Sequence, residues 1–189
     1  MADNKPKETI ELVGKGWFIH IKDAYVSDYG AKLGIKPSYT LQLAVEKGSK
    51  EWGKLVHAAK TVLGIDKIGL KELRAKDGDR EVSKKGNPLS PGNWLITVSS
   101  QFPIAIVDSD AKPLDLEEEP GDGSLLNVAV TVKAGEDRET GLPRVSTYLG
   151  GVQVLTVEEN NAPKPYQFGA YIQQTVGNDG AIVDADKAF

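Results

Sequence analysis

Apolar and polar residues alternate along several stretches of the chain, with the period of two that is typical of half-buried β-strands. In chain order, the predicted strands are residues 16–26, 39–46, 94–100, 125–133 and 144–158. Residues 103–108 are expected to continue the third of these strands past a bend. Residues 1–14 are expected to be frayed or to lie at an edge. In the first strand, the alternation places Trp17 on one face with Ile19 and Ile21. It places Phe18, His20 and Lys22 on the opposite face.

One stretch has the period of a helix instead. Between residues 50 and 63, apolar side chains recur at spacings of three and four, which gives a single apolar stripe. Ser49 is suited to cap the start of this helix, and Gly64 is suited to end it. A shorter helix, capped by Asp66, is predicted over residues 67–74. Five curved strands with one main helix inserted after the second predict a mainly β protein, built as a small and partly open barrel.

Glycine, proline and charged residues mark the connections between these elements. The predicted connections are residues 27–38, 75–93, 108–123 and 134–143. The second is expected to be a long mobile loop, the third is strongly acidic, and the fourth is expected to join a hairpin. Residues 1–158 are therefore expected to form one domain, and the weakly patterned residues 159–189 a flexible, weakly acidic tail.

The composition of the 189 residues excludes several classes of site. Without cysteine, the chain has no thiolate nucleophile and no cysteine-based metal site. The two histidines are isolated, and no nucleophile or phosphate-loop motif is present. The run that begins at Asp108 resembles a calcium loop, but Lys112 and Pro113 stand where a ligand and a glycine are needed. We therefore predict that the protein is not an enzyme and binds no metal or cofactor.

The net charge of −4 conceals an asymmetry between the two halves of the chain. Residues 1–86 carry a net charge of +5 and residues 87–189 a net charge of −9. Such an asymmetry is compatible with an anionic partner, and also with a solvated surface whose charges cluster. The N-terminus lacks the apolar core of a signal peptide, and no apolar run approaches the length needed to cross a membrane. A soluble intracellular protein is expected.

Aromatic and basic residues are interleaved in the first two predicted strands and their loop, and Arg144, Ser146 and Tyr148 share one face of the last strand. If the outward faces of the first and last strands join, Phe18 and Lys22 would form a basic groove with Arg144 and Tyr148. Aromatic rings that stack on bases, together with cations that follow the phosphates, are what single-stranded nucleic acid requires. Taken alone, Tyr and Phe residues on strands more often serve packing within the sheet.

The order of four segments resembles the single-stranded DNA-binding proteins of tailed bacteriophages. These segments are GNWLITVSS, PIAIVDSDAKPLD, GSLLNVAVTVKA and GLPRVSTYLGGVQVL, and the likeness extends over about residues 16–157. The resemblance implies an OB-fold that coats single strands during phage replication and recombination, in the cytoplasm of the infected bacterium. It also implies an acidic tail that ends in an aromatic residue and recruits replication proteins, a role that Asp184, Asp186 and Phe189 would have here.

We therefore predict a protein that binds single-stranded DNA without sequence preference, as a monomer or homodimer and without contact to a membrane. The expected stacking residues are Phe18, Tyr39, Trp94 and Tyr148. The expected phosphate contacts are Lys22, Lys32, Lys36, Arg74, Arg80, Lys133 and Arg144. A structural or partner-binding β-barrel of a virion and a carbohydrate-binding module remain alternatives, although neutral sugars would not need the basic residues.

Overall fold

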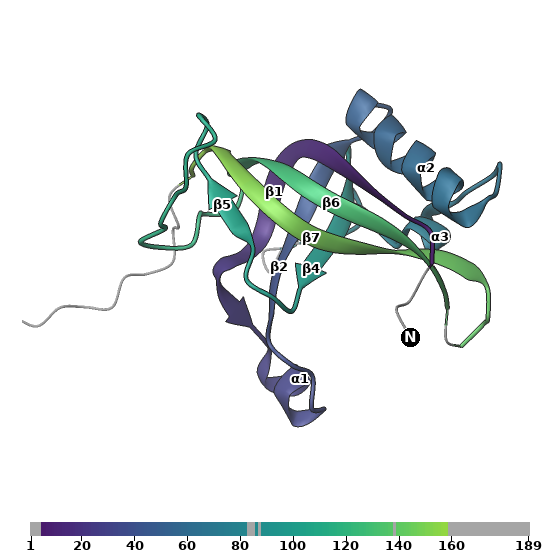
Figure 1. Cartoon of the computed structure of the whole chain (residues 1–189), viewed down its shortest axis with the longest axis horizontal. Helices are drawn as coiled ribbons and strands as arrows, with labels where there is room; N and C mark the ends of the chain where they lie inside the picture. Colours follow the sequence, from purple (N-terminus) through teal and green to yellow (C-terminus); the bar gives the residue numbers. More distant parts are fainter. Residues whose placement is uncertain (1–4, 83–85, 87, 138, 159–189) are drawn as a thin grey trace, which may run out of the picture.

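The computed structural model describes residues 5–82, 86, 88–137 and 139–158, and these residues form seven strands and three helices (Figure 1). The strands are β1 (Lys7–Tyr25), β2 (Ser38–Glu46), β3 (Ala75–Asp77), β4 (Asn93–Ser100), β5 (Ala105–Val107), β6 (Leu125–Glu136) and β7 (Pro143–Thr156). The helices are α1 (Asp28–Lys32), α2 (Lys50–Leu63) and α3 (Leu70–Leu73). The predicted tail, with Asp184, Asp186 and Phe189, lies outside the described residues.

Five of the strands form a closed barrel. The sheet order is β3-β4-β2-β1-β6-β7-β5, and a parallel contact between Ser99 of β4 and Tyr148 of β7 closes the cylinder. The barrel strands are thus β1, β2, β4, β6 and β7, while β3 and β5 extend the sheet beside β4 and β7. Five barrel strands with a helix inserted between the second and the third agree with the OB-fold that the sequence resemblance implies. The first and last barrel strands do not pair, because β6 lies between them.

Helix α2 packs its apolar stripe against the barrel core (Figure 1). Leu55, Ala58, Ala59 and Val62 are buried, as the spacing of apolar residues predicts. Ser49 caps the helix by accepting a hydrogen bond from Trp52 N at 3.2 Å, and Gly64 ends it in the left-handed conformation. Among the described residues, no helix is both long and apolar enough to cross a bilayer.

Several elements differ from the sequence-based expectations. Residues 7–14 are not frayed, since Lys7–Lys15 pair with β6 over their whole length. The connection over residues 75–93 begins with β3, which pairs with the start of β4. Strand β5 does not continue β4 but pairs in parallel with β7. In addition, helix α3 is capped by Glu72, whose carboxylate accepts from Gly69 N at 2.9 Å, and not by Asp66.

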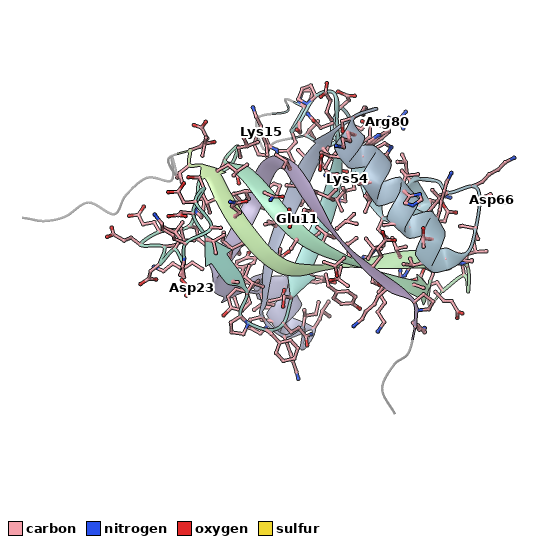
Figure 2. All side chains as sticks on the ribbon, turned by 45° about the horizontal axis from the view of Figure 1, so that its top comes forward. Glu11, Lys15, Asp23, Lys54, Asp66 and Arg80 are labelled. Atoms are coloured by element: carbon pink, nitrogen blue, oxygen red, sulfur yellow. The ribbon has the colours of Figure 1, made fainter. Side chains whose placement is uncertain are left out.

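Strand β1 changes its partner halfway along its length. Lys7–Lys15 pair with β6, whereas the segment from Lys15 to Tyr25 pairs with β2. Each half therefore has one strand neighbour and one edge whose backbone groups need other partners. At the first half, Glu51 of α2 accepts from Val13 N at 3.2 Å and Lys54 Nζ donates to Glu11 O at 3.2 Å. Figure 2 shows Lys54 beside β1 near Glu11.

The change of partner requires two glycines in β1. A Cβ atom at Gly14 would lie 2.3 Å from the carbonyl oxygen of Ala44, and one at Gly16 would lie 2.7 Å from Leu126 Cδ1. Backbone atoms of β2 and a core side chain therefore occupy the space that any other residue would need. The tight approach lets one strand belong to both halves of the barrel.

Replacing Gly14 by alanine is expected to lower the free energy of unfolding by about 1–3 kcal/mol, because the new methyl group overlaps the backbone of β2. Gly53→Ala is the matched control, since a Cβ at this position in α2 meets nothing within 4 Å. That change is expected to raise stability by about 0.5–1 kcal/mol through the higher helix propensity of alanine. Urea unfolding of both variants measures the difference, and equal stabilities would contradict the proposed close approach.

Candidate nucleic-acid interface

A bulge at Phe18 changes which side chains of β1 face outward. Trp17 pairs with Gln42 and His20 pairs with Thr40. Two residues therefore lie between the paired positions on β1, but only one lies between them on β2. Phe18 adopts a positive φ of 50° at this point, which is uncommon for an aromatic residue. The bulge turns Trp17 to the outer face, together with His20, and the prediction that Trp17 shares a face with Ile19 and Ile21 is wrong.

The outer surfaces of β1, β2 and β4 form a continuous face with aromatic residues at both ends. In one row across the strands, Tyr148 lies beside Ser99, Ser99 beside Thr40, and Thr40 beside His20. The next row joins Thr97, Gln42 and Trp17. We call this surface the aromatic face, and its members are Trp17, His20, Tyr25, Thr40, Gln42, Thr97, Ser99 and Tyr148.

The rings of the aromatic face are available for contact in different degrees. Tyr25 and Tyr148 have 47% and 46% of their surface exposed. His20 stacks on Tyr25 with the ring centroids 4.1 Å apart and the planes at 10°. Trp17 is half-buried, and its Nε1 has no hydrogen-bond partner among the described residues. The face thus presents flat rings flanked by the hydroxyl and amide groups of the central strands.

Basic side chains border the aromatic face. Lys15 and Lys76 stand at the two ends of the row that also contains Ala44 and Leu95, and both lysines are exposed. Lys15 lies on the outside of β1 (Figure 2). At the opposite end, the loop between β1 and β2 carries α1 away from the barrel (Figure 1). This projecting loop holds Lys32 and Lys36, both exposed, as the sequence suggests.

The hairpin between β6 and β7 brings three further predicted residues together. Lys133 stands opposite Ser146, and Arg144 and Tyr148 lie two residues to either side of Ser146 on β7. Arg144 donates to Asp137 across 2.8 Å, and Asp137 also accepts from the backbone N–H groups of Glu139 and Thr140. Arg144 shares a cavity of about 530 Å³ with Arg74 and Lys76. Arg144 and Tyr148 share one side of β7, as the sequence predicts.

Phe18 and Lys22 do not join this group. Strands β2 and β4 separate them from Tyr148, because β1 and β7 are not neighbours. Phe18 N donates to Asp122 at 2.6 Å, and Lys22 Nζ donates to the carbonyl oxygen of Glu117 at 2.5 Å. The expected groove built from the outward faces of the first and last strands is therefore wrong, and Lys22 lies beside the acidic connection.

Three other predicted site residues lie away from the aromatic face. Trp94 faces the interior side of β4, with its ring against Trp52 at 5.6 Å and Lys47 Nζ 4.3 Å from its centroid. Tyr39 is half-buried and packs on the barrel core. Arg80 lies in the turn after β3, well apart from Asp23 (Figure 2). The strand alternation already places Tyr39 and Trp94 with inward-facing residues, and packing accounts for both.

Sequence reasoning missed Trp17, Tyr25 and His20 as members of one surface. The aromatic residues themselves are visible in the sequence, and His20 is correctly placed on an outward face. The one-residue bulge that brings Trp17 beside it leaves no signal in a pattern of period two. A non-glycine residue with positive φ can be recognised only from the backbone.

No protein-family model and no curated protein sequence matches the chain. Its fold, however, is found in solved structures. The single-stranded DNA-binding protein from bacteriophage Enc34, in complex with single-stranded DNA, superposes with a TM-score of 0.62 at 17% identity over 82% of this chain and 89% of that chain. The single-stranded DNA-binding protein gp2.5 of bacteriophage T7 superposes with a TM-score of 0.55 at 12% identity over 89% of this chain and 100% of the other.

The chain has the fold of these phage single-stranded DNA-binding proteins. A second structure of the Enc34 protein gives the same result, with a TM-score of 0.59 at 16% identity over 85% of this chain and 87% of that chain. The resemblance noted from the order of four sequence segments is thereby confirmed, and the fold it implies extends over most of the chain.

The β6–β7 hairpin is expected to depend on the ionised form of Asp137. Backbone N–H groups of Thr140 and Glu139, together with Arg144, hold the pKa of Asp137 below its ordinary value of 3.8. A carboxyl group whose pKa is lower in the folded than in the unfolded state stabilises the fold at pH values above its unfolded pKa. This contribution is lost as the pH falls through the folded pKa. Asp137→Asn should therefore be less stable than wild type near neutral pH, and the two should converge in acid.

Denaturant unfolding at a series of pH values measures this difference. The matched control is Glu136→Gln, which removes the same charge from the exposed neighbouring residue. If Asp137→Asn and Glu136→Gln follow the same pH curve, the hydrogen bonds to Asp137 do not stabilise the hairpin.

Proposed function

We propose that the protein binds single-stranded DNA, without sequence preference, across the aromatic face. The observation that carries this proposal is the row from Tyr148 through Ser99 and Thr40 to His20, with Trp17 in the adjoining row. Every base has a flat face that can stack on an aromatic ring, whatever its identity. Rings spaced across three strands can therefore hold successive bases of any sequence.

The position of the aromatic face within the fold supports the same proposal. In OB-folds, oligonucleotides bind on the second and third barrel strands, between the loop that joins strands one and two and the loop that joins strands four and five. Here those strands are β2 and β4, and the two loops are residues 26–37 and 137–142. Lys32 and Lys36 lie in the first loop, and Arg144 follows the second. Cations thus stand at both ends of the surface, where a phosphate backbone would enter and leave.

The solved structures support DNA as the partner. The proteins of Enc34 and T7 that share this fold are single-stranded DNA-binding proteins, and one of the Enc34 structures contains the ligand. OB-folds also bind oligosaccharides, for which aromatic platforms alone would serve. The lysines and arginines around the aromatic face favour a polyanion over a neutral sugar.

Such a protein would protect exposed strands during phage DNA replication and recombination in the cytoplasm of an infected bacterium. It would act as a binder rather than an enzyme, as a monomer or homodimer. The residues of the predicted tail, Asp184, Asp186 and Phe189, would recruit replication proteins. This wider role follows from binding to single strands, so binding is the step to test first.

Fluorescence anisotropy of a labelled oligothymidine, titrated with the protein at two salt concentrations, tests the proposal. We expect binding that weakens as salt rises, because each phosphate contact releases counterions. His20→Ala and Tyr148→Ala should each weaken binding by about 1–3 kcal/mol, the contribution of one stacking contact. His57→Ala is the matched control, since His57 is exposed on α2, outside the aromatic face.

Two results would contradict the proposal. A wild-type protein that ignores oligothymidine but binds a neutral oligosaccharide would be a carbohydrate-binding module. Equal affinities for His20→Ala, Tyr148→Ala and His57→Ala would place the DNA on another surface of the barrel.

Two lysines of β1, Lys15 and Lys22, are expected to behave differently. Lys15 borders the aromatic face and forms no ion pair among the described residues, so Lys15→Ala should weaken binding to all sequences. The slope of log affinity against log salt should fall by about 0.7, the value for one contact to a single strand. Lys22→Ala should leave that slope unchanged, because Lys22 Nζ donates a hydrogen bond to the carbonyl oxygen of Glu117 in the acidic connection. An equal loss of slope for the two variants would show that the phosphate track also passes Lys22.

A further inference from the structure

The second half of β1 has a free edge that the acidic connection covers. Pairing with β6 ends at Lys15, so the backbone N–H groups beyond it on that edge lack a strand partner. Glu119 accepts from Ile21 N at 2.9 Å, from Lys22 N at 3.0 Å and from Asp23 N at 3.1 Å. Asp122 accepts from Phe18 N. Two carboxylates thus accept hydrogen bonds from four backbone amides of β1. Three of these amides are consecutive, which only a backbone that departs from regular strand geometry allows.

The position of these carboxylates is fixed by the barrel. Gly123 N donates to Gly16 O at 2.8 Å, and Gly16 N donates to Ser124 O at 2.9 Å. Gly121 N donates to Glu158 O at 2.8 Å, and the buried Ser124 hydroxyl donates to Gly121 O at 2.7 Å. Residues 121–124, which follow Glu119, are therefore hydrogen-bonded both to β1 and to Glu158, just beyond the end of β7.

The amides that Glu119 and Asp122 bind belong to the segments that orient the aromatic residues of β1. Phe18 is the bulge residue that turns Trp17 outward. Ile21, Lys22 and Asp23 span the interval between His20 and Tyr25, in which the register with β2 shifts. His20 and Tyr25, which stand at the two ends of this interval, stack on each other. The carboxylates therefore hold the backbone at the two places where β1 departs from regular strand geometry.

We propose that Glu119 and Asp122 are positioning residues for the DNA-binding rings of β1. These two acidic residues would then increase the affinity for a polyanion, although their charge alone would repel it. Their role is to fix a backbone whose regular pairing is interrupted, so that Trp17, His20 and Tyr25 are arranged before DNA arrives. The inference rests on the proposed function and adds two residues that do not touch the ligand.

The first test compares two substitutions that remove the same charge from adjacent residues. Glu119→Gln replaces one acceptor oxygen by an NH2 group. This group faces backbone N–H donors and cannot accept hydrogen bonds from them. Glu118→Gln is the matched control, because Glu118 is exposed and forms no hydrogen bond or ion pair with the residues that the structure describes. We expect Glu119→Gln to bind oligothymidine about tenfold more weakly, with an unchanged salt slope because no phosphate contact is lost. Glu118→Gln should bind as tightly as wild type or slightly more tightly.

A double-mutant cycle separates positioning from a general loss of structure. If Glu119 acts through the His20–Tyr25 stack, Glu119→Gln should have little further effect in a Tyr25→Ala background. In a Tyr148→Ala background its tenfold effect should persist, because Tyr148 lies on β7. An effect of equal size in both backgrounds would overturn the assignment.

Asp122 provides a second pair of variants in case Glu119→Gln does not fold. Asp122→Ala removes the acceptor for Phe18 N. Asp115→Ala removes an exposed acid of the same connection, whose side chain makes no hydrogen bond within the described part of the chain. Weaker DNA binding by Asp122→Ala than by Asp115→Ala is expected.

Tighter binding by Glu119→Gln and Asp122→Ala would overturn the inference. It would mean that these carboxylates occupy sites where DNA phosphates bind. If the wild type itself does not bind oligothymidine, the proposed function fails. If the wild type binds and Glu119→Gln behaves like Glu118→Gln, only the positioning role fails.

Discussion

The structure depends on a single strand that serves two parts of the barrel. Strand β1 pairs first with β6 and then with β2, and without this change of partner the five strands could not close. The change has two physical requirements. Gly14 and Gly16 must lack side chains where β1 passes close to its neighbours. The backbone N–H groups left unpaired on each half of β1 must find hydrogen-bond acceptors. Carboxylates meet the second requirement on both halves. Glu51 accepts a hydrogen bond from Val13 N on the first half, and Glu119 accepts one from Ile21 N on the second half.

This constraint gives the acidic residues a role that net charge does not reveal. The sequence shows an acidic connection after β5, and by composition alone such a segment argues against a polyanionic partner. In the structure, two of its carboxylates accept hydrogen bonds from the backbone of β1. Glu119 is half-buried against β1, while the lysines that border the aromatic face are exposed. A count of charges along a chain therefore says less about its ligand than the surfaces on which the charges lie.

Sequence patterns predicted the parts of the fold that are governed by burial. Helix α2 has its predicted ends because Ser49 and Gly64 supply the caps, and the alternation in β2, β4, β6 and β7 follows from one face of each strand being buried. The sequence could not reveal β3, since three residues are too few to show a period. It indicated a strand within residues 103–108 but not that β5 pairs with β7. Residues 7–13 are not frayed, and their free edge is satisfied in part by a helix rather than by a second strand.

The candidate site was harder to predict than the fold, for a physical reason. Arg144 and Tyr148 were correctly placed on one side of β7, because they lie four residues apart on a regular part of the strand. Trp17 was assigned to the wrong face, because the bulge at Phe18 shifts the alternation by one residue. A binding surface assembled from three strands depends on such shifts, which local patterns do not record. The fold itself depends on few positions, so the Enc34 and T7 proteins share it with this chain at only 12–17% identity. Closing the barrel constrains glycines, buried positions and edge acceptors, and leaves most outward-facing residues free to vary.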